Sequence, residues 1–392
     1  MMATKTTSEP KPGNHSIKLG HSVGLALEPF DLPASNQRML SAPHPCNTVI
    51  PLALRLSNMT EVKLETINRS IETLQKQDGL FTKKLALHGA LLFRGLPIGN
   101  AKDFSDFSHA FGYRPHEIIG SIAKRPLLAP NVSIASEAPK EVLIYNHNEL
   151  PRLPYSPAYI FFFGEETAKR GGETSISSSL ELFTRAQQEM PEFIEELVGK
   201  GILSTITYKA SKQFEGGTTL REAFGKEIED HDDEITQRRK IEAQIKRYGR
   251  GEHTTWRWID DGLIVTHRLS AIRTQPKTNL PTLFTGLAAY YKSAQLQNDT
   301  NRGVTQMYGD GTPIPDHFLA HLAQITDQIR VLHKWEQGDV LVFDNIIAQH
   351  GREPWEGEQS DRVVLASLFD GDSLPGGYGP EDWAQVVQLV DE

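Results

Sequence analysis

Two short stretches far apart in the chain hold residue types that bind redox-active metals. His147 and Glu149 lie one residue apart within 145–150, and His350 ends the stretch 345–350. On a β-strand successive side chains point to opposite faces, so His147 and Glu149 project the same way. Two imidazoles and one carboxylate form the facial triad that holds non-haem iron(II) and leaves three octahedral positions open. The residue types therefore indicate a candidate iron site.

The elements that must position these residues are short strands bounded by turn residues. Runs of apolar and β-branched residues predict strands, and apolar residues at spacings of two to four predict helices. The segments expected to contain strands are 88–95, 142–145, 159–163, 171–177, 256–259, 263–266, 281–285, 338–345 and 362–368. The expected helices lie at 57–87, after a cap at Asp103, and at 180–188, 191–200 and 315–325.

The composition excludes several classes of protein. The 392 residues carry a formal net charge of -9 without a basic block, which argues against a nucleic-acid partner. No run reaches the roughly 18 apolar residues of a membrane span, so we expect no membrane partner. The one cysteine, Cys46, excludes an intrachain disulfide and a Cys-rich zinc site and fits a reducing compartment. Because the N-terminus is polar, with no signal-peptide core, we expect a cytoplasmic protein.

The chain reads as one domain with two unusual segments. Residues 1–20 are polar and are expected to form a mobile N-terminal tail, while 21–392 form a single domain. The stretch 212–254 is strongly charged, with few apolar anchors, chiefly Ile228 and Ile235. We interpret it as a helical insertion or lid.

Several motifs together resemble the iron(II)/2-oxoglutarate-dependent dioxygenases of the taurine dioxygenase (TauD/TfdA)-like family. The closest subgroup is the clavaminate-synthase-like one, which uses Glu where other members use Asp. The resemblance runs from about 85 to 369 and implies a double-stranded β-helix (jelly roll), mainly β with surrounding helices (α+β). The residues that carry it are His147-x-Glu149, Gly171-Gly172-Glu173-Thr174, the run 338–345, His350-Gly351-Arg352 and Arg362.

The resemblance also implies roles for individual residues. His147, Glu149 and His350 would ligate Fe(II), and Arg362 and Thr174 would hold the distal carboxylate of 2-oxoglutarate, with O2 as the further co-substrate. A fork of guanidinium donors suits a carboxylate. The implied reaction hydroxylates, desaturates or cyclises at an unactivated C–H bond and releases succinate and CO2. Halogenases of this kind lack the carboxylate ligand, so the presence of Glu149 favours the other outcomes.

Each anchor has an alternative reading. Arg352 is a second candidate for the 2-oxoglutarate partner, although it follows His350 closely. Arg362 could instead pair with Asp361 or Glu358 at the surface, and either histidine could be an ordinary residue of a polar core.

The substrate side carries weaker signals. Asn146 and Asn148 flank the ligands and are candidates for hydrogen bonds to substrate, and Arg273 is a candidate partner for a substrate carboxylate. We expect a small-molecule substrate that is amino-acid-derived or carries a carboxylate or sulfonate. The oligomeric state stays open, and a homo-oligomer is compatible with the sequence.

Two rival functions use the same residues. A metal-dependent hydrolase or isomerase could hold zinc or manganese on the triad, but it would not need the Thr174 and Arg362 pair. A non-catalytic small-molecule binding protein on the same fold would be expected to lack one ligand or the anchor arginine, and all are present.

Overall fold

Two sheets pack face to face at the centre of the protein, and all their strand pairs are antiparallel except β5 with β6, which is parallel. A computed structural model describes residues 16–19, 26–57, 62–121, 126–213, 217–249, 253–296 and 304–371. The larger sheet has ten strands, and the smaller one has four. An apolar cluster with members from both sheets fills the space between them. This arrangement is the predicted double-stranded β-helix with helices outside it, so the expected fold is confirmed.

The larger sheet runs from the N-terminal strands to the last described strand. Its order is β1 (Ile17–Lys18), β2 (Ala26–Pro29), β5 (Leu52–Leu56), β6 (Ala90–Arg94), β20 (Val340–Asp344), β11 (Tyr159–Glu166), β22 (Val363–Gly371), β9 (Val132–Ile134) and β8 (Leu127–Ala129), with β7 (Arg114–Pro115) also paired to β22.

The central strand β11 shows why both faces of this sheet are buried. Phe161 and Phe163 join the apolar cluster on the helix-covered face. Ile160 and Phe162 alternate with them and join the cluster between the two sheets. A strand buried on both faces reads as a continuous apolar run, and β11 has that pattern.

The smaller sheet carries the candidate ligands. Its order is β10 (Ile144–His147), β21 (Ala348–Arg352), β12 (Thr174–Ser178) and β19 (Val331–His333). Two further pairs are short: β3 (Arg38–Met39) with β4 (Val49–Ile50), and β16 (Ile272–Thr274) with β17 (Pro281–Leu283).

Helices cover the outer faces of both sheets. Those packed on the larger sheet are α1 (Leu64–Asp78), α2 (Leu80–His88) and α3 (Ala101–His109). Those packed beside the smaller sheet are α4 (Ser179–Glu189), α5 (Pro191–Lys200), α8 (Leu287–Leu296) and α9 (Asp316–Ile329). None of the helices in the described ranges is long and apolar enough to cross a membrane.

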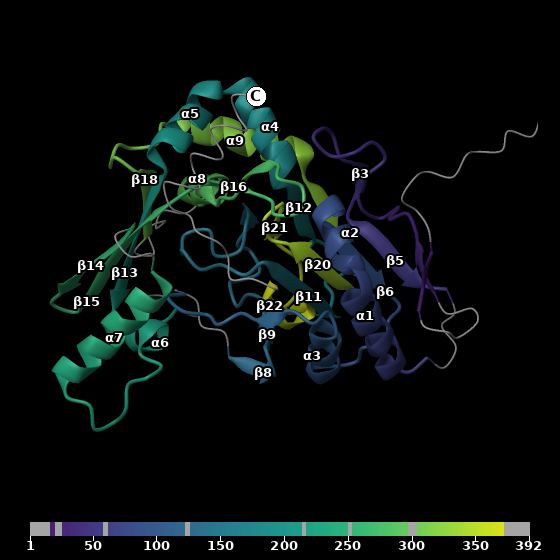
Figure 1. Cartoon of the computed structure of the whole chain (residues 1–392), viewed down its shortest axis with the longest axis horizontal. Helices are drawn as coiled ribbons and strands as arrows, with labels where there is room; N and C mark the ends of the chain where they lie inside the picture. The colour runs from purple at the N-terminus through teal and green to yellow at the C-terminus, as the bar shows by residue number, and fades with distance from the viewer. Residues whose placement is uncertain are drawn as a thin grey trace, which may run out of the picture.

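A third sheet lies at the opposite end of the molecule from α1 and α2 (Figure 1). Its order is β14 (Thr254–Ile259), β15 (Gly262–Leu269), β13 (Ile202–Lys209) and β18 (Val304–Tyr308). The charged insertion at 212–254 contributes α6 (Leu220–Phe224) and α7 (Glu234–Tyr248), which pack against this sheet.

The insertion is helical as expected, but its anchors differ from the predicted ones. Ile241 and Ile245 are buried on α7, whereas Ile235 is 78% exposed. Ile235 lies in the first turn of α7 and does not join the apolar cluster between the helix and the sheet. Ile228 is only partly buried.

Two details near the N-terminal helices also differ from expectation. The segment 57–87 forms two helices because Gly79 adopts a φ of 60° between them. The cap of α3 is Asn100, whose side chain accepts a hydrogen bond from the backbone N–H of Asp103. Most of the expected tail at 1–20 lies outside the described residues, while Ile17 and Lys18 form β1.

Candidate active site

The two histidines of the candidate triad lie opposite each other on neighbouring strands. β10 and β21 pair antiparallel, and His147 and His350 are partners in their register. Glu149 comes two residues after His147, where the chain leaves β10 and turns at Leu150 with a φ of 53°. The structure thus brings together the three residues that the sequence singled out.

These side chains place their donor atoms close enough to share one ion. One ligand atom from each residue lies within 4.8 Å of the other two. Nε2 of His350 is 3.2 Å from Oε2 of Glu149, and Nε2 of His147 is 3.9 Å from the same oxygen. Cis ligands of an octahedral ion at about 2.1 Å lie about 3 Å apart. The donor set therefore fits a facial triad for iron(II).

A backbone hydrogen bond determines which nitrogen of His147 faces the other ligands. Nδ1 of His147 donates to the carbonyl of Tyr145 at 2.9 Å, which leaves the lone pair of Nε2 toward Glu149. Burial, together with the nearby His350 ring, lowers the pKa of His147 to about 4. The ring is therefore neutral at pH 7, and neutral imidazole is the form that binds a metal.

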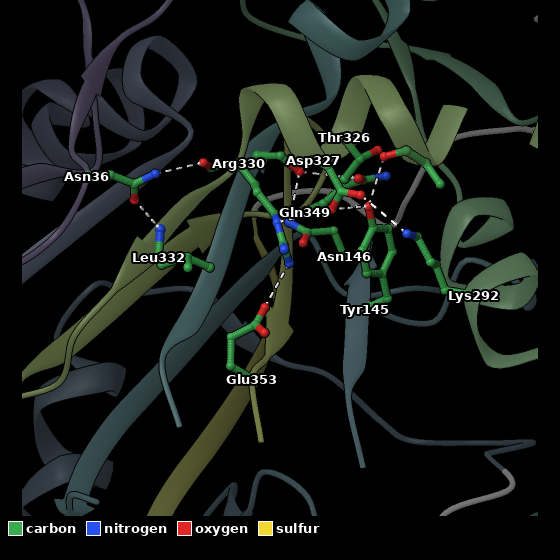
Figure 2. A network of polar contacts seen from close by, with 12 residues as sticks. Asn36, Tyr145, Asn146, Lys292, Thr326, Asp327, Arg330, Leu332, Gln349 and Glu353 are labelled. Carbon is green, nitrogen blue, oxygen red and sulfur yellow. Dashed lines mark hydrogen bonds and ion pairs between the residues drawn. The ribbon is translucent and has the colours of Figure 1, made fainter. Parts of the chain in front are cut away.

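Tyr145 is in turn held by a polar network with α9 (Figure 2). Its hydroxyl donates to the carbonyl of Ala323 at 2.9 Å and to Oδ1 of Asp327 at 2.8 Å. Lys292 and Arg330 lie on either side of Asp327, at 3.3 Å and 3.2 Å from its carboxylate oxygens. The network joins β10 to two helices and restrains the strand that carries the first histidine ligand.

Asn345 holds the backbone of Glu149, the candidate carboxylate ligand. Its Oδ1 accepts from the N–H of Glu149 at 2.7 Å, and its Nδ2 donates to the carbonyl of Glu149 at 3.1 Å. The same Nδ2 donates to the carbonyl of Pro157 at 2.7 Å. Because the chain after β10 has left the sheet ladder, this side chain replaces the missing strand partner.

Asn146 and Asn148 point away from the triad, to the other face of β10. Asn148 donates to the carbonyl of Asn345 at 2.6 Å and accepts from the N–H of Thr285 at 2.8 Å. Asn146 donates to the hydroxyl of Ser177 at 3.0 Å. Both side chains are fully buried and tie segments of the protein together. We therefore leave both out of the substrate contacts proposed below.

Arg362 and Thr174, the expected anchors for 2-oxoglutarate, lie against each other. Arg362 donates from Nε to the carbonyl of Gly172 at 2.7 Å and from Nη2 to Oγ1 of Thr174 at 3.4 Å. A Cβ at Gly172 would lie 2.8 Å from Cδ of Arg362, so glycine is needed there. Trp335 donates from its indole to the same Thr174 oxygen at 2.9 Å.

The guanidinium of Arg362 is electrostatically prepared for an anion. Within the described ranges, no carboxylate forms a salt bridge with it, although the charge of Glu173 acts on it from nearby. Burial, followed by the positive charge of Arg352, lowers the pKa of Arg362 to about 9. Asp361 and Glu358 cap each other's backbone instead of pairing with Arg362. A buried cation that forms no salt bridge within the described ranges fits the distal carboxylate of 2-oxoglutarate.

Arg352, the alternative anchor, is used differently. Its Nη1 and Nη2 donate to three backbone carbonyls between 138 and 142, at 2.7 to 2.9 Å. The guanidinium therefore braces the chain leading into β10. Its role in the fold explains its burial without a bound ligand.

A cavity of about 260 Å³ opens beside the triad. Its wall includes His147, Arg152, Tyr290, Ser293 and Gln306. Of the described residues that line it, Arg152 is the only Lys, Arg, Asp or Glu. The cavity therefore combines a ligand histidine, one cation and several neutral polar groups.

The structure separates the substrate-side residues that the sequence suggested from those that line the cavity. Arg273 is buried, donates to the hydroxyl of Ser156 at 3.2 Å and stacks 3.5 Å from the ring centre of Phe284. It is not among the lining residues of the cavity. Arg152 and Gln306 are, and sequence reasoning missed both. The one local signal for Arg152 is its position three residues after the carboxylate ligand.

Comparison with known proteins relates these features to a family. Residues 59–367 match the family described as taurine catabolism dioxygenase TauD, TfdA. A clavaminate synthase-like protein of Arabidopsis thaliana is 29% identical over 300 residues, covering 76% of this chain and 86% of that protein. The dapdiamide synthesis protein DdaC of Enterobacter agglomerans is 27% identical over 331 residues, covering 81% and 93%. A solved taurine dioxygenase from Burkholderia xenovorans aligns over 88% of this chain and 93% of its own, with 14% identity and a TM-score of 0.47.

Proposed function

The chain belongs to the TauD, TfdA family of taurine catabolism dioxygenases, and from this premise we propose that it oxidises an unactivated C–H bond of a small, amino-acid-derived or carboxylate- or sulfonate-bearing molecule. As a member of that family it is an iron(II)- and 2-oxoglutarate-dependent dioxygenase. The observation that carries the proposal is the convergence of His147, Glu149 and His350 beside a cavity.

We assign each co-substrate to residues of this chain. The triad would hold iron(II), and Arg362 with Thr174 would hold the distal carboxylate of 2-oxoglutarate. The chemistry supplied by bound iron, 2-oxoglutarate and O2 is oxidation of a C–H bond, coupled to formation of succinate and CO2. The protein contributes orientation and a water-poor pocket.

The protein groups act by holding and orienting. The bond from Nδ1 of His147 to the Tyr145 carbonyl keeps Nε2 unprotonated and aimed at the ion. The Asn345 clamp fixes the backbone of Glu149 and would so hold its carboxylate in place for a bound ion. The indole of Trp335 donates to Oγ1 of Thr174. Because Oγ1 accepts that bond, its own proton is available for a carboxylate acceptor.

The charge of the cavity supports an anionic substrate. Arg152 is the only Lys, Arg, Asp or Glu among the described lining residues, and its charge is close enough to His147 to affect that ring. A guanidinium matches carboxylate and sulfonate geometry. Tyr290, Ser293 and Gln306 add neutral polar groups to the wall. A small molecule with one anionic group fits this lining.

The rival functions account for less of the site. A hydrolase or isomerase would use the triad but would leave the buried Arg362 without a purpose. A binding protein would have no need for three donor atoms within 4.8 Å of one another. Iron chemistry with a keto-acid co-substrate uses every one of these groups.

The first test is formation of the iron–2-oxoglutarate complex. Anaerobic protein with iron(II) and 2-oxoglutarate should show the weak visible charge-transfer band of the chelate. His147→Ala should abolish the band, while His317→Ala, on the surface of α9, should leave it unchanged. A folded wild-type protein that binds iron but shows no band would overturn the proposal.

The second test concerns the anionic group. Succinate release should be measured with a panel of small carboxylates and sulfonates and their uncharged esters or amides. Arg152→Gln should reduce turnover of the charged members, and Arg239→Gln, an exposed change on α7, should not. Equal turnover of charged and uncharged members by the wild type would refute the anionic substrate.

A further inference from the structure

A row of polar side chains crosses the buried face of the third sheet. Ser204 on β13 is the register partner of Gln306 on β18 and of His267 on β15. His267 in turn faces Thr254 on β14, and its Nδ1 lies 3.0 Å from the Thr254 hydroxyl. Because cross-strand partners lie on the same face of a sheet, the four side chains form one continuous row.

The surroundings of this row are apolar. Two residues away on the same three strands, this face carries Ile206, Val265 and Val304. All three belong to a hydrophobic cluster that includes residues of α6 and α7. Ser204 is fully buried and His267 is nearly so. Polar side chains in such surroundings need hydrogen-bond partners.

Three atoms of the row have no such partner within the described ranges. They are Oε1 of Gln306, Oγ of Ser204 and Nε2 of His267, all shielded from solvent. Buried polar atoms in folded proteins nearly always have a partner, so a cluster of three calls for an explanation. Of these three residues, Gln306 is the one that also lines the cavity beside the triad.

The row begins at the wall of the cavity beside the triad. Gln306 and Val304 line that cavity, as does His147. From Gln306 the row continues into the sheet through Ser204 and His267. A molecule bound next to the candidate iron ligands would therefore meet the amide of Gln306, with the other two groups behind it.

We propose that Gln306, held in place by Ser204 and His267 behind it, recognises a hydrogen-bond donor group of the substrate, such as an amide N–H, an amine or a hydroxyl. The inference rests on the proposed function and adds to it a substrate class: small anions that also carry such a donor group. Arg152 would receive the anionic group, and Gln306 the donor group.

This two-point recognition has a physical consequence for selectivity. A site built to hydrogen-bond a substrate group rejects an analogue that lacks the group, because the buried polar atoms of the site then stay unpaired. Replacement of the donor group by methyl should weaken binding by about tenfold or more. A purely apolar wall would favour the methyl analogue.

The experiment uses matched pairs of anionic probes in which a donor group is replaced by methyl. The pairs are succinamate with 4-oxopentanoate, and 4-hydroxybutanoate with pentanoate. Dissociation constants are read from perturbation of the anaerobic iron–2-oxoglutarate band. Wild-type protein should bind the donor-bearing member of at least one pair about tenfold more tightly. Gln306→Leu should reduce this preference to about threefold or less.

Met307→Leu is the control, because Met307 is the next residue on β18 and points to the exposed face. It should keep the wild-type preference. Equal binding of both members by the wild type, an undiminished preference in Gln306→Leu, or binding of neither pair would overturn the inference. If the band itself fails to form in the wild type, the proposed function fails instead.

Ser204→Ala separates recognition from a structural role. If the hydroxyl serves a ligand, its removal should leave the thermal unfolding temperature of the ligand-free protein unchanged or higher, while weakening the donor-bearing probe. A lower unfolding temperature without loss of probe binding would place the hydroxyl in the fold alone and would remove Ser204 from the recognition row.

Discussion

Replacing Arg362 with methionine tests the keto-acid anchor most directly. The guanidinium is buried, its described hydrogen-bond acceptors are the carbonyl of Gly172 and the hydroxyl of Thr174, and neither is charged. Methionine keeps much of the volume but removes the charge and the donors. The change should therefore affect 2-oxoglutarate binding far more than folding.

The expected loss of 2-oxoglutarate affinity follows from the charge of Arg362 and the hydrogen bonds it would make. Burial first, and then the charge of Arg352, lowers the pKa of Arg362 from its ordinary 12.5 to about 9, so the charged form gains from an anionic partner. Hydrogen bonds to charged groups contribute about 1.5–3 kcal/mol each. Two bonds to a carboxylate are then worth at least about 3 kcal/mol, or more than about 100-fold in Kd.

The stability of the ligand-free variant should change little. Loss of the bonds to Gly172 and Thr174 costs about 1–3 kcal/mol, whereas removal of a buried charge returns a similar amount. Without 2-oxoglutarate, Arg362→Met should therefore unfold near the wild-type temperature. With saturating 2-oxoglutarate the wild type should gain stability, and the variant should not.

The assay is an anaerobic titration of the iron(II) protein with 2-oxoglutarate, followed by the visible charge-transfer band and by calorimetry. Arg170→Met is the matched control, since Arg170 is 80% exposed and pairs only loosely with Glu356 at 3.5 Å. It should bind like the wild type. An iron-loaded Arg362→Met protein whose Kd stays within about fivefold of the wild-type value would refute the assignment of the anchor.

Three further changes test the elements around the triad. Asn345→Ala removes three buried hydrogen bonds, two of them to the backbone of Glu149. It should lower the free energy of unfolding, measured in urea, by about 3 kcal/mol and should also reduce iron affinity. An unchanged iron affinity would contradict the role of Asn345 in holding Glu149. Glu149→Ala should lower bound iron per protein in a metal assay at low iron concentration, because one of three ligands is lost, whereas the surface change Glu336→Ala should not. Burial raises the pKa of Asp344 from 3.8 to about 6, so the folded state binds more protons between these pH values and the stability of the wild type falls as pH rises through that window. Asp344→Asn should therefore stabilise the protein more at pH 7.5 than at pH 5, by about 1.4 kcal/mol in the free energy of unfolding. An equal effect at both pH values would disprove this titration.

Most of the fold could be predicted because its strands and helices have strong local patterns. The apolar run of β11 and the glycine-bounded run of β20 indicated buried strands, and α5 was expected at its observed bounds. The sequence around α3 does not decide which residue caps the helix. Asn100 and Asp103 are both good capping residues, and the packing of the helix decides where it begins.

The site shows the same division between local and long-range information. The common orientation of His147 and Glu149 follows from the two-residue period of an extended chain. The same period places Asn146 and Asn148 on the other face, where the structure buries both, although the sequence suggested them as substrate contacts. The approach of His350 depends on the register of β10 with β21, which residue types alone suggested and the family resemblance supported.

Arg152 and Gln306 had no comparable signal, and the reason bears on how such a protein changes its substrate. Gln306 lies on an edge strand of a sheet that carries none of the candidate ligands, and among the described strands β18 pairs with β13 alone. Substitutions there can alter the polar lining of the cavity while the pairing of β10 with β21 is preserved. Substitutions in β10 would instead disturb both the triad and the cavity, because β10 supplies a candidate ligand histidine and, through Tyr145, part of the cavity wall. Variation in substrate preference is therefore expected to concentrate in the third sheet and α8, where no local pattern in the sequence is required to be kept.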